Sequence, residues 1–382
     1  MISNSLTIAL ACALPLLAII SSLIANPFVR GTGKRNKKDE DTTNESLPRV
    51  TVVVLSKGTS EQIEAHLPAI LAQKYEPGFD VVVVASKGDS ATDDVLKRLS
   101  AAPNLYKTFV PSESLFMSRG KLAVTIGVKA SQNEWILLTD SRCCPASENW
   151  ISTMVAHCHE ADTILGYVGY DEEAKPFYRF TRLREQLYIL RRAARKKAVA
   201  ATGANIMFRK SKFIAGDGFR GNLQYTLGEY DFIANKYSEQ GHTAIETSPE
   251  ARITEDAPTP FEWRGYRKGA ISYRNHLAGI GSLRFIHWFD TLLLWLNYAL
   301  IIGIGVAAGL LHQWIILGAA SAALVLTIVL RTILGARAMK RYGAGVSAWS
   351  IVVYELRSLF ATFGTRLAYM RADKNEFTSH KL

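Results

Sequence analysis

Cysteine and acidic residues are both scarce in this chain. Only four of its 382 residues are cysteine, and none of them forms a CxxC pair. This scarcity excludes a disulfide-stabilised scaffold and argues against a structural zinc site. The 34 Asp and Glu residues are outnumbered by 45 Lys and Arg residues, which gives a net charge of +11. No phosphate-binding P-loop occurs in the sequence, so an ATPase is not expected.

Charge is missing altogether from two long apolar runs. Residues 6–25 contain no charged residue, and about twenty helical residues span a hydrocarbon core of ~30 Å. The alternative is a cleaved signal peptide, but the first five residues contain no Lys or Arg, which favours an uncleaved anchor. Residues 291–330 form a second uncharged run of forty residues, twice the length of one span. This run predicts a helical hairpin with its turn near His312.

Basic residues flank both runs and predict their orientation. Residues 30–38 contain five Lys or Arg, and residues 331–382 contain nine against three acidic residues. By the positive-inside rule both flanks face the cytoplasm. Residues 347–369 have apolar side chains at spacings of three and four, which favours an amphipathic helix on the inner leaflet over a third span or a helix packed on the soluble domain. The predicted parts are an anchor (1–28), a basic polar linker (29–46), a cytoplasmic domain (47–285), a transmembrane hairpin (289–330) and a basic cytoplasmic tail (331–382).

The cytoplasmic domain has the pattern of an α/β fold. Residues 50–55 and 80–85 are continuous β-branched runs, typical of strands buried on both faces of a parallel sheet. Residues 61–73 between them have apolar side chains at helical spacing, so the three segments form a βαβ unit. Residues 93–99 predict a further helix, and residues 134–139 a further buried strand. We therefore expect a mostly parallel, nucleotide-binding sheet.

Polar residues follow three of the predicted strands. In open α/β sheets, ligands bind beyond the carboxyl ends of the strands. The residues at these ends are Ser56, Ser86 and Asp140. A lone Asp after a strand is often only a helix N-cap, so Asp140 needs support from its neighbours.

Four segments, in their order along the chain, resemble the family 2 glycosyltransferases, inverting enzymes with the nucleotide-diphospho-sugar transferase fold. Residues 48–86 resemble the first βαβ unit of that family, and residues 118–151 resemble the segment leading to its metal-binding acidic motif. Residues 202–213 resemble the acceptor-side strand, and residues 227–242 the segment with the catalytic base. The resemblance implies a membrane-anchored bacterial glycosyltransferase.

The resemblance also implies a mechanism and a cofactor. A carboxylate removes the proton from the acceptor hydroxyl, which displaces the nucleoside diphosphate from the sugar. Asp231 matches the base position best, with Glu229 beside it, although both acids could merely complement the dipole at a helix N-terminus. The negative charge that builds on the diphosphate needs a cation, usually Mg²⁺ or Mn²⁺, and Asp140 is the candidate metal ligand.

The chain departs from the family pattern at the position of the metal. Where the family has Asp-x-Asp, this sequence reads Asp140-Ser141-Arg142, so a cation has replaced an anion. The acidic residue that the family usually has after its second strand is also missing, and Ser86 is followed by Lys87 and Gly88. Basic residues that could hold the diphosphate instead are Arg142, Arg119, Lys121 and Arg267.

These departures leave two hypotheses. In the first, Arg142 takes over part of the work of the metal, because a guanidinium binds phosphate oxygens in bidentate fashion. In the second, the chain is a catalytically degenerate scaffold or binding subunit of a glycan assembly complex. The expected partners are a nucleotide sugar, a glycan or lipid-linked acceptor and membrane lipids.

A basic run at residues 179–197 could bind an anionic partner. In a membrane-tethered protein it is more plausibly directed at anionic lipid or a lipid-linked phosphate than at nucleic acid, and a solvated helix face is the other interpretation. We expect no nucleic-acid partner. The predicted location is the bacterial inner membrane, as a multi-pass protein with a cytoplasmic catalytic domain and C-terminus. The expected role is polysaccharide biosynthesis in the cell envelope.

Overall fold

The computed structural model describes residues 2–29, 47–111, 114, 116–195 and 197–378. Nearly all of the predicted linker, residues 30–46, lies outside this part of the chain. The chain forms two compact units. Unit 1 contains residues 1–31, 179–188 and 281–363, and unit 2 contains residues 32–178, 189–280 and 364–382.

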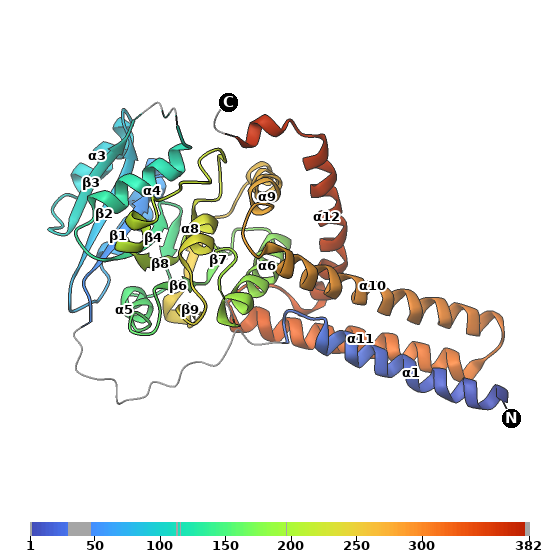
Figure 1. Cartoon of the computed structure of the whole chain (residues 1–382). Coiled ribbons are helices and arrows are strands. Elements are labelled where there is room, and N and C mark those ends of the chain that lie inside the picture. The colour runs from blue at the N-terminus through green and yellow to red at the C-terminus, as the bar shows by residue number, and fades with distance from the viewer. Residues whose placement is uncertain (1, 30–46, 112–113, 115, 196, 379–382) are drawn as a thin grey trace. The chain divides into compact units, whose positions relative to one another are not determined.

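A mostly parallel sheet is the centre of unit 2 (Figure 1). Among the described residues seven strands form it, in the order β3-β2-β1-β4-β8-β6-β9. The first four strands are parallel, and β8 runs antiparallel to both β4 and β6. The predicted α/β fold class is therefore confirmed. The strands are β1 (Val50–Leu55), β2 (Phe79–Ser86), β3 (Leu105–Val110), β4 (Trp135–Asp140), β6 (Thr163–Gly166), β8 (Ile206–Arg209) and β9 (Thr243–Glu246).

The register of the central strands brings their carboxyl ends together. Every residue of β1 and of β4 is buried, as expected for β-branched and apolar runs covered on both faces. Leu55 at the end of β1 pairs with Val84 of β2 on one side and with Asp140 of β4 on the other. The loops that follow β1, β2 and β4 therefore leave the sheet at one edge.

Helices connect the strands of unit 2. The first of them, α2, begins with a capping box in which Thr59 and Gln62 satisfy each other's backbone N–H groups. The helices α2 and α3 correspond to the predicted helices at 61–73 and 93–99 with small shifts at their ends. The helices are α2 (Ser60–Leu71), α3 (Ser90–Arg98), α4 (Arg119–Ala130), α5 (Trp150–Val155), α7 (Lys210–Ala215), α8 (Glu229–Tyr237) and α9 (Pro260–Arg274), while α6 (Pro176–Arg195) contributes to both units.

A second, smaller sheet is absent from the sequence-based expectations. It consists of β5 (Cys143–Pro145), β10 (Ile253–Glu255) and β7 (Val168–Tyr170). Each strand is only three residues long, too short to show a period of two in the sequence. In this sheet Glu255 pairs with Cys143, three residues after Asp140. The small sheet therefore brings acidic residues from far along the chain to the end of β4.

Unit 1 is helical, and its first helix packs along a much later one. Its helices are α1 (Ile2–Ile24), α10 (Ile280–Leu310), α11 (Trp314–Arg341) and most of α12 (Ile351–Arg371). Among the described residues three helices, α1, α10 and α11, are long and apolar enough to cross a membrane. The helices α1 and α11 lie side by side (Figure 1). Leu14 and Ala18 of α1 pack with Ala320 and Ala323 of α11 in one apolar cluster.

One buried ion pair joins three helices of unit 1. Arg331 of α11 donates two hydrogen bonds to the carboxylate of Glu355 in α12, with N–O distances of 2.6 and 2.7 Å. The same guanidinium donates to the carbonyl oxygens of Ser21 (3.1 Å) and Ala25 (3.4 Å) at the end of α1. The last carbonyl groups of a helix have no partner within it, so Arg331 caps α1.

The basic helix α6 and the tail helix α12 both contain buried residues. In α6, Arg184 is buried and donates to the Ser358 hydroxyl at 3.0 Å, so the basic run is not a solvated face there. In α12, Ile351, Glu355 and Leu359 are buried. Phe360 on the same helix is 65% exposed. An amphipathic helix on the inner leaflet stays a prediction.

Candidate active site

The loops after β1 and β4 are tied together at the sheet edge. The Ser141 hydroxyl accepts hydrogen bonds from the backbone N–H groups of Lys57 (3.2 Å) and Gly58 (3.0 Å). A Cβ added at Gly58 would lie 2.9 Å from Cγ of Arg142, so a glycine is needed for this close approach. Asp140 and Arg142 are thus held beside the loop that begins at Ser56.

Asp140 is a buried carboxylate with three partners. Its side chain is almost fully buried, and it accepts hydrogen bonds from the Tyr230 hydroxyl (3.0 Å) and the Arg142 backbone N–H (3.1 Å). The Arg142 guanidinium lies 3.7 Å from its Oδ2. Burial acts to raise the pKa of Asp140, but the charges of Arg142 and Lys57 outweigh it and leave the pKa below its ordinary value. Asp140 is therefore ionised.

Two cationic side chains face the carboxylates at this edge. The Arg142 guanidinium lies between Asp140 and Glu255, 3.4 Å from the Glu255 carboxylate. Its Nε is buried and finds no hydrogen-bond partner among the residues that the structure describes. The Lys57 ammonium forms an ion pair with Glu229 and lies 4.4 Å from the centre of the Tyr230 ring. Positive charge and a free donor are thus available beyond the strands.

The two carboxylates of α8 have different partners. Gly228 precedes this helix with a φ of +96°, and a Cβ there would lie 2.6 Å from the Tyr273 ring, so only glycine fits. Glu229 is directed to Lys57 at the strand edge. Asp231 accepts hydrogen bonds from the Ala201 backbone N–H (2.8 Å) and from Nε of Arg274 (2.7 Å). The two carboxylates therefore have no partner in common among these contacts.

The comparisons with known proteins agree with this architecture. Residues 48–216 match the family model described as glycosyltransferase like family 2. The chain contains a glycosyltransferase family 2-like domain. No curated protein matches the chain.

Two solved structures give the scale of the structural likeness. A mannosyltransferase from Pyrobaculum calidifontis, in complex with GDP-Man and Mn²⁺, is 17% identical with a TM-score of 0.50, and the match covers 87% of this chain and 97% of that one. Residues 1–349 of S. aureus TarS, in complex with UDP-GlcNAc, are 13% identical with a TM-score of 0.43, covering 81% of this chain and 92% of that one. At 17% identity, the likeness to the mannosyltransferase shows the fold alone.

The side chains of this glycosyltransferase domain do not fit a divalent cation at the end of β4. Mg²⁺ is bound at about 2.0–2.1 Å by oxygen ligands, several of them usually water. The charged side chains that lie next to Asp140 are the cations Arg142 and Lys57, which repel a metal ion instead of binding it. Within the described part of the chain, no group of three or more His, Cys, Asp or Glu side chains could hold a metal ion. A positive charge is present at this place, but the protein supplies it.

Other residues predicted for the glycosyltransferase site lie in different places. Ser86 accepts a hydrogen bond from Arg119 at 2.7 Å, so both are at the strand edge. Lys121 is fully buried and donates to the Tyr225 carbonyl oxygen, and burial lowers its pKa to about 7. Arg267 lies in α9, 4.7 Å from the ring of Trp263. Lys121 is therefore not among the side chains that meet at the strand edge.

Two acidic residues near the site were missed by the sequence analysis. Glu255 contacts Arg142, as described above. Asp256 accepts a hydrogen bond from Gln62 and lies 2.8 Å from Nε2 of His66, both on α2. The only signal in the sequence is the adjacent acidic pair itself, because its strand is too short to recognise.

Proposed function

We propose that this protein transfers a sugar from a nucleoside-diphosphate donor to a glycan or a lipid-linked acceptor, with Arg142 and Lys57 opposing the charge of the leaving diphosphate. The observation that carries the proposal is the Arg142 guanidinium at the end of β4, next to Asp140 and with its Nε unbonded among the described residues. A guanidinium suits two phosphate oxygens at once. Donors fixed in advance around a developing charge lower the barrier most effectively. Ser56, Ser86 and Arg119 complete the part of the site that binds the nucleotide sugar.

Glu229 is the base that the contacts favour. It removes the proton from the acceptor hydroxyl, whose oxygen forms a bond to the anomeric carbon while the bond from that carbon to the diphosphate oxygen breaks. Asp231, which the sequence pattern favoured, is engaged by Ala201 and Arg274 on the other side of α8. We assign Asp231 a positioning role, which keeps Glu229 directed at the strand edge.

The membrane setting is part of the proposal. We infer that α1, α10 and α11 cross the membrane, because each is long and apolar enough to do so. The basic segments after α1 and α11 favour a cytoplasmic location for the domain and the C-terminus. Such a protein works at the inner membrane of a bacterial cell, where polysaccharides of the envelope are assembled from cytoplasmic nucleotide sugars. Membrane lipids are then permanent partners.

A scaffold function is the second candidate. The observation that favours it is that the ionised groups at the strand edge already pair with one another, Asp140 with Arg142 and Glu229 with Lys57. A domain that had lost its chemistry could retain these pairs for stability alone. In that case nucleotides do not bind.

Nucleotide-dependent stabilisation separates the two functions. The full chain in detergent is heated with UDP, GDP or dTDP, each with Mn²⁺ or with EDTA, because a ligand that binds the folded state raises Tm. We expect a rise with one nucleotide that persists in EDTA. In Arg142→Ala the affinity falls about tenfold or more, since a hydrogen bond to a charged group is lost.

The control is Arg220→Ala, which removes an exposed arginine from the same domain. It should respond to the nucleotide like the unaltered protein. A rise that needs Mn²⁺ and survives Arg142→Ala contradicts the role of Arg142. No response to any nucleotide favours the scaffold.

A further inference from the structure

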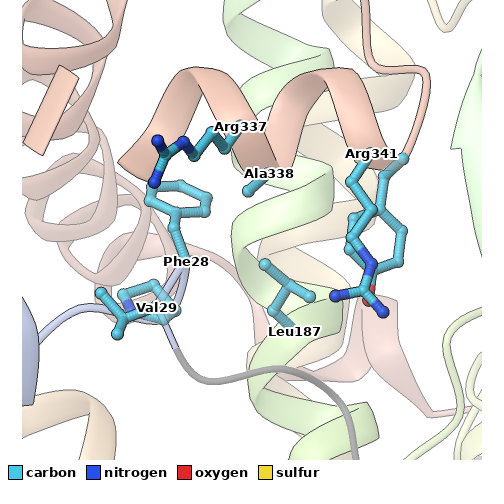
Figure 2. A pocket seen from close by; sticks show the side chains of 8 residues that line it. Phe28, Val29, Leu187, Arg337, Ala338 and Arg341 are labelled. Carbon is cyan, nitrogen blue, oxygen red and sulfur yellow. The ribbon is translucent and has the colours of Figure 1, made fainter. Parts of the chain in front are cut away.

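Unit 1 contains a small basic cavity at the ends of two of its apolar helices. Its volume is about 120 Å³. Figure 2 shows Arg337, Ala338 and Arg341 on one helix, with Phe28 and Leu187 on the side that faces it. We call this the basic cavity; it is lined by Pro27, Phe28, Val29, Leu187, Arg337, Ala338, Arg341 and Tyr342.

Local structure builds the apolar wall of the basic cavity. Directly after α1, the side chain of Asn26 accepts a hydrogen bond from the Phe28 backbone N–H at 2.9 Å, and its carbonyl oxygen accepts one from Val29 N–H at 3.3 Å. This turn directs the chain across the end of α11. The Phe28 ring packs against Phe180 of α6, with ring centroids 5.6 Å apart. The wall is therefore held in place from two sides.

The opposite wall is cationic. Arg337 and Arg341 are four residues apart on α11, so they lie on the same face, one turn apart. Among the described residues that line the cavity, none is acidic. Arginine binds phosphate oxygens through its planar fork and is more weakly hydrated than lysine. The cavity thus combines two phosphate-binding groups with an apolar surface.

The size and position of the basic cavity indicate what fills it. A volume of 120 Å³ is smaller than the ~300–1,000 Å³ of sites that enclose a whole small-molecule ligand, so only part of a molecule enters. Both α1 and α11 have candidate spans that end toward the cavity. If they cross the membrane as proposed above, the cavity lies at the depth of the lipid headgroups. Basic pockets between membrane helices at that depth bind anionic headgroups.

We propose that the basic cavity binds the phosphate group of an anionic phospholipid, with Arg337 and Arg341 on the phosphate and Phe28, Val29 and Leu187 against the start of the acyl chains. This site is separate from the nucleotide-sugar site and adds a bound lipid to the membrane unit.

The test is lipid binding by the full chain in detergent, followed by native mass spectrometry and by Tm. The probes are phosphatidylglycerol, phosphatidylcholine and inorganic phosphate. We expect phosphatidylglycerol to bind and to raise Tm, and the other two to do neither. Each arginine near the membrane surface contributes about fivefold to the binding of anionic lipid, so R337Q/R341Q should bind phosphatidylglycerol about 25-fold more weakly.

Two further variants separate the cavity from general surface charge. Lys340→Gln removes an exposed charge from the same turn outside the cavity and should weaken binding less than twofold. Ala338→Leu keeps both arginines but fills the cavity, and it should abolish the rise in Tm. Nucleotide stabilisation should be intact in all variants, which shows that the domain is folded.

Three results would overturn the lipid site. The first is an equal loss in Lys340→Gln and in R337Q/R341Q, which means general attraction to the surface. The second is equal binding of phosphatidylcholine. The third is a rise in Tm with inorganic phosphate as large as with phosphatidylglycerol, which means that the cavity takes free phosphate.

Discussion

Burial of the Lys121 ammonium makes the stability of the glycosyltransferase domain depend on pH. Burial disfavours the charged form and lowers its pKa from 10.5 to about 7 in the folded protein. Between pH 7 and 10.5 the unfolded chain therefore binds more protons at Lys121 than the folded chain does. The free energy of unfolding should rise with pH in this window, by at most about 1.4 kcal/mol per pH unit. Denaturation in urea at pH 7, 8 and 9 measures the slope.

Lys121→Met is the matched variant, because it keeps much of the aliphatic stem and removes the titration. Lys57 also has a lowered pKa, about 8, so some slope is expected to remain in this variant. The difference between the two proteins isolates Lys121. Identical slopes would show that Lys121 does not titrate in this range.

The close contact at Gly58 predicts a second effect of a single residue. A Cβ at this position would lie 2.0 Å from Oε1 of Gln62 and 2.9 Å from Cγ of Arg142, so both side chains must move. Overpacking of this kind costs about 1–3 kcal/mol, and we expect Gly58→Ala to lower nucleotide affinity about tenfold. Isothermal titration calorimetry with the nucleotide measures this affinity. Gly265→Ala, where a Cβ meets nothing within 4 Å, should bind normally.

At the scale of helices, the Arg331–Glu355 pair predicts a strong dependence of stability on both partners. Each side chain is almost completely buried, and the pair joins α11 to α12 while Arg331 also caps α1. Removing one partner leaves a buried charge unpaired, which costs about 3–5 kcal/mol. We expect Glu355→Gln and Arg331→Met each to lower Tm in detergent clearly.

The double variant R331M/E355L tests whether the charges themselves matter. Apolar residues of similar volume often replace a buried pair without loss. The double variant should recover part of the Tm lost in the single variants. Full additivity of the two losses would show that the residues act independently.

The length of an element decides how well the sequence predicts it. The strand β1 has six consecutive buried residues, and its predicted ends agree with the structure. The three-residue strand β10 leaves no periodic signal, so the contact of Glu255 with Arg142 could not be predicted. The position of Asp140 followed from the end of a buried strand. Its pairing with Tyr230 depends on how α8 folds back, which no local pattern encodes.

At the scale of the whole chain, the proposed topology predicts which residues are accessible from each side of the membrane. In a variant without any of the four native cysteines, one cysteine at a time is placed at Gln313, in the turn between α10 and α11, or at Lys374, after α12. A membrane-impermeant maleimide added to intact cells should label position 313 only. Position 374 should react only after permeabilisation. The opposite pattern would reverse the proposed orientation.

The capping of α1 by Arg331 has a consequence for biosynthesis. The bond to Ser21 joins residues 310 positions apart in the chain. At ~5–20 residues per second, a ribosome needs about 15–60 s to cover that distance. During this interval α1 is already made, while the arginine that donates hydrogen bonds to its last carbonyl groups does not yet exist. A chain that ends before Arg331 would leave these carbonyl groups of α1 without their hydrogen-bond donor.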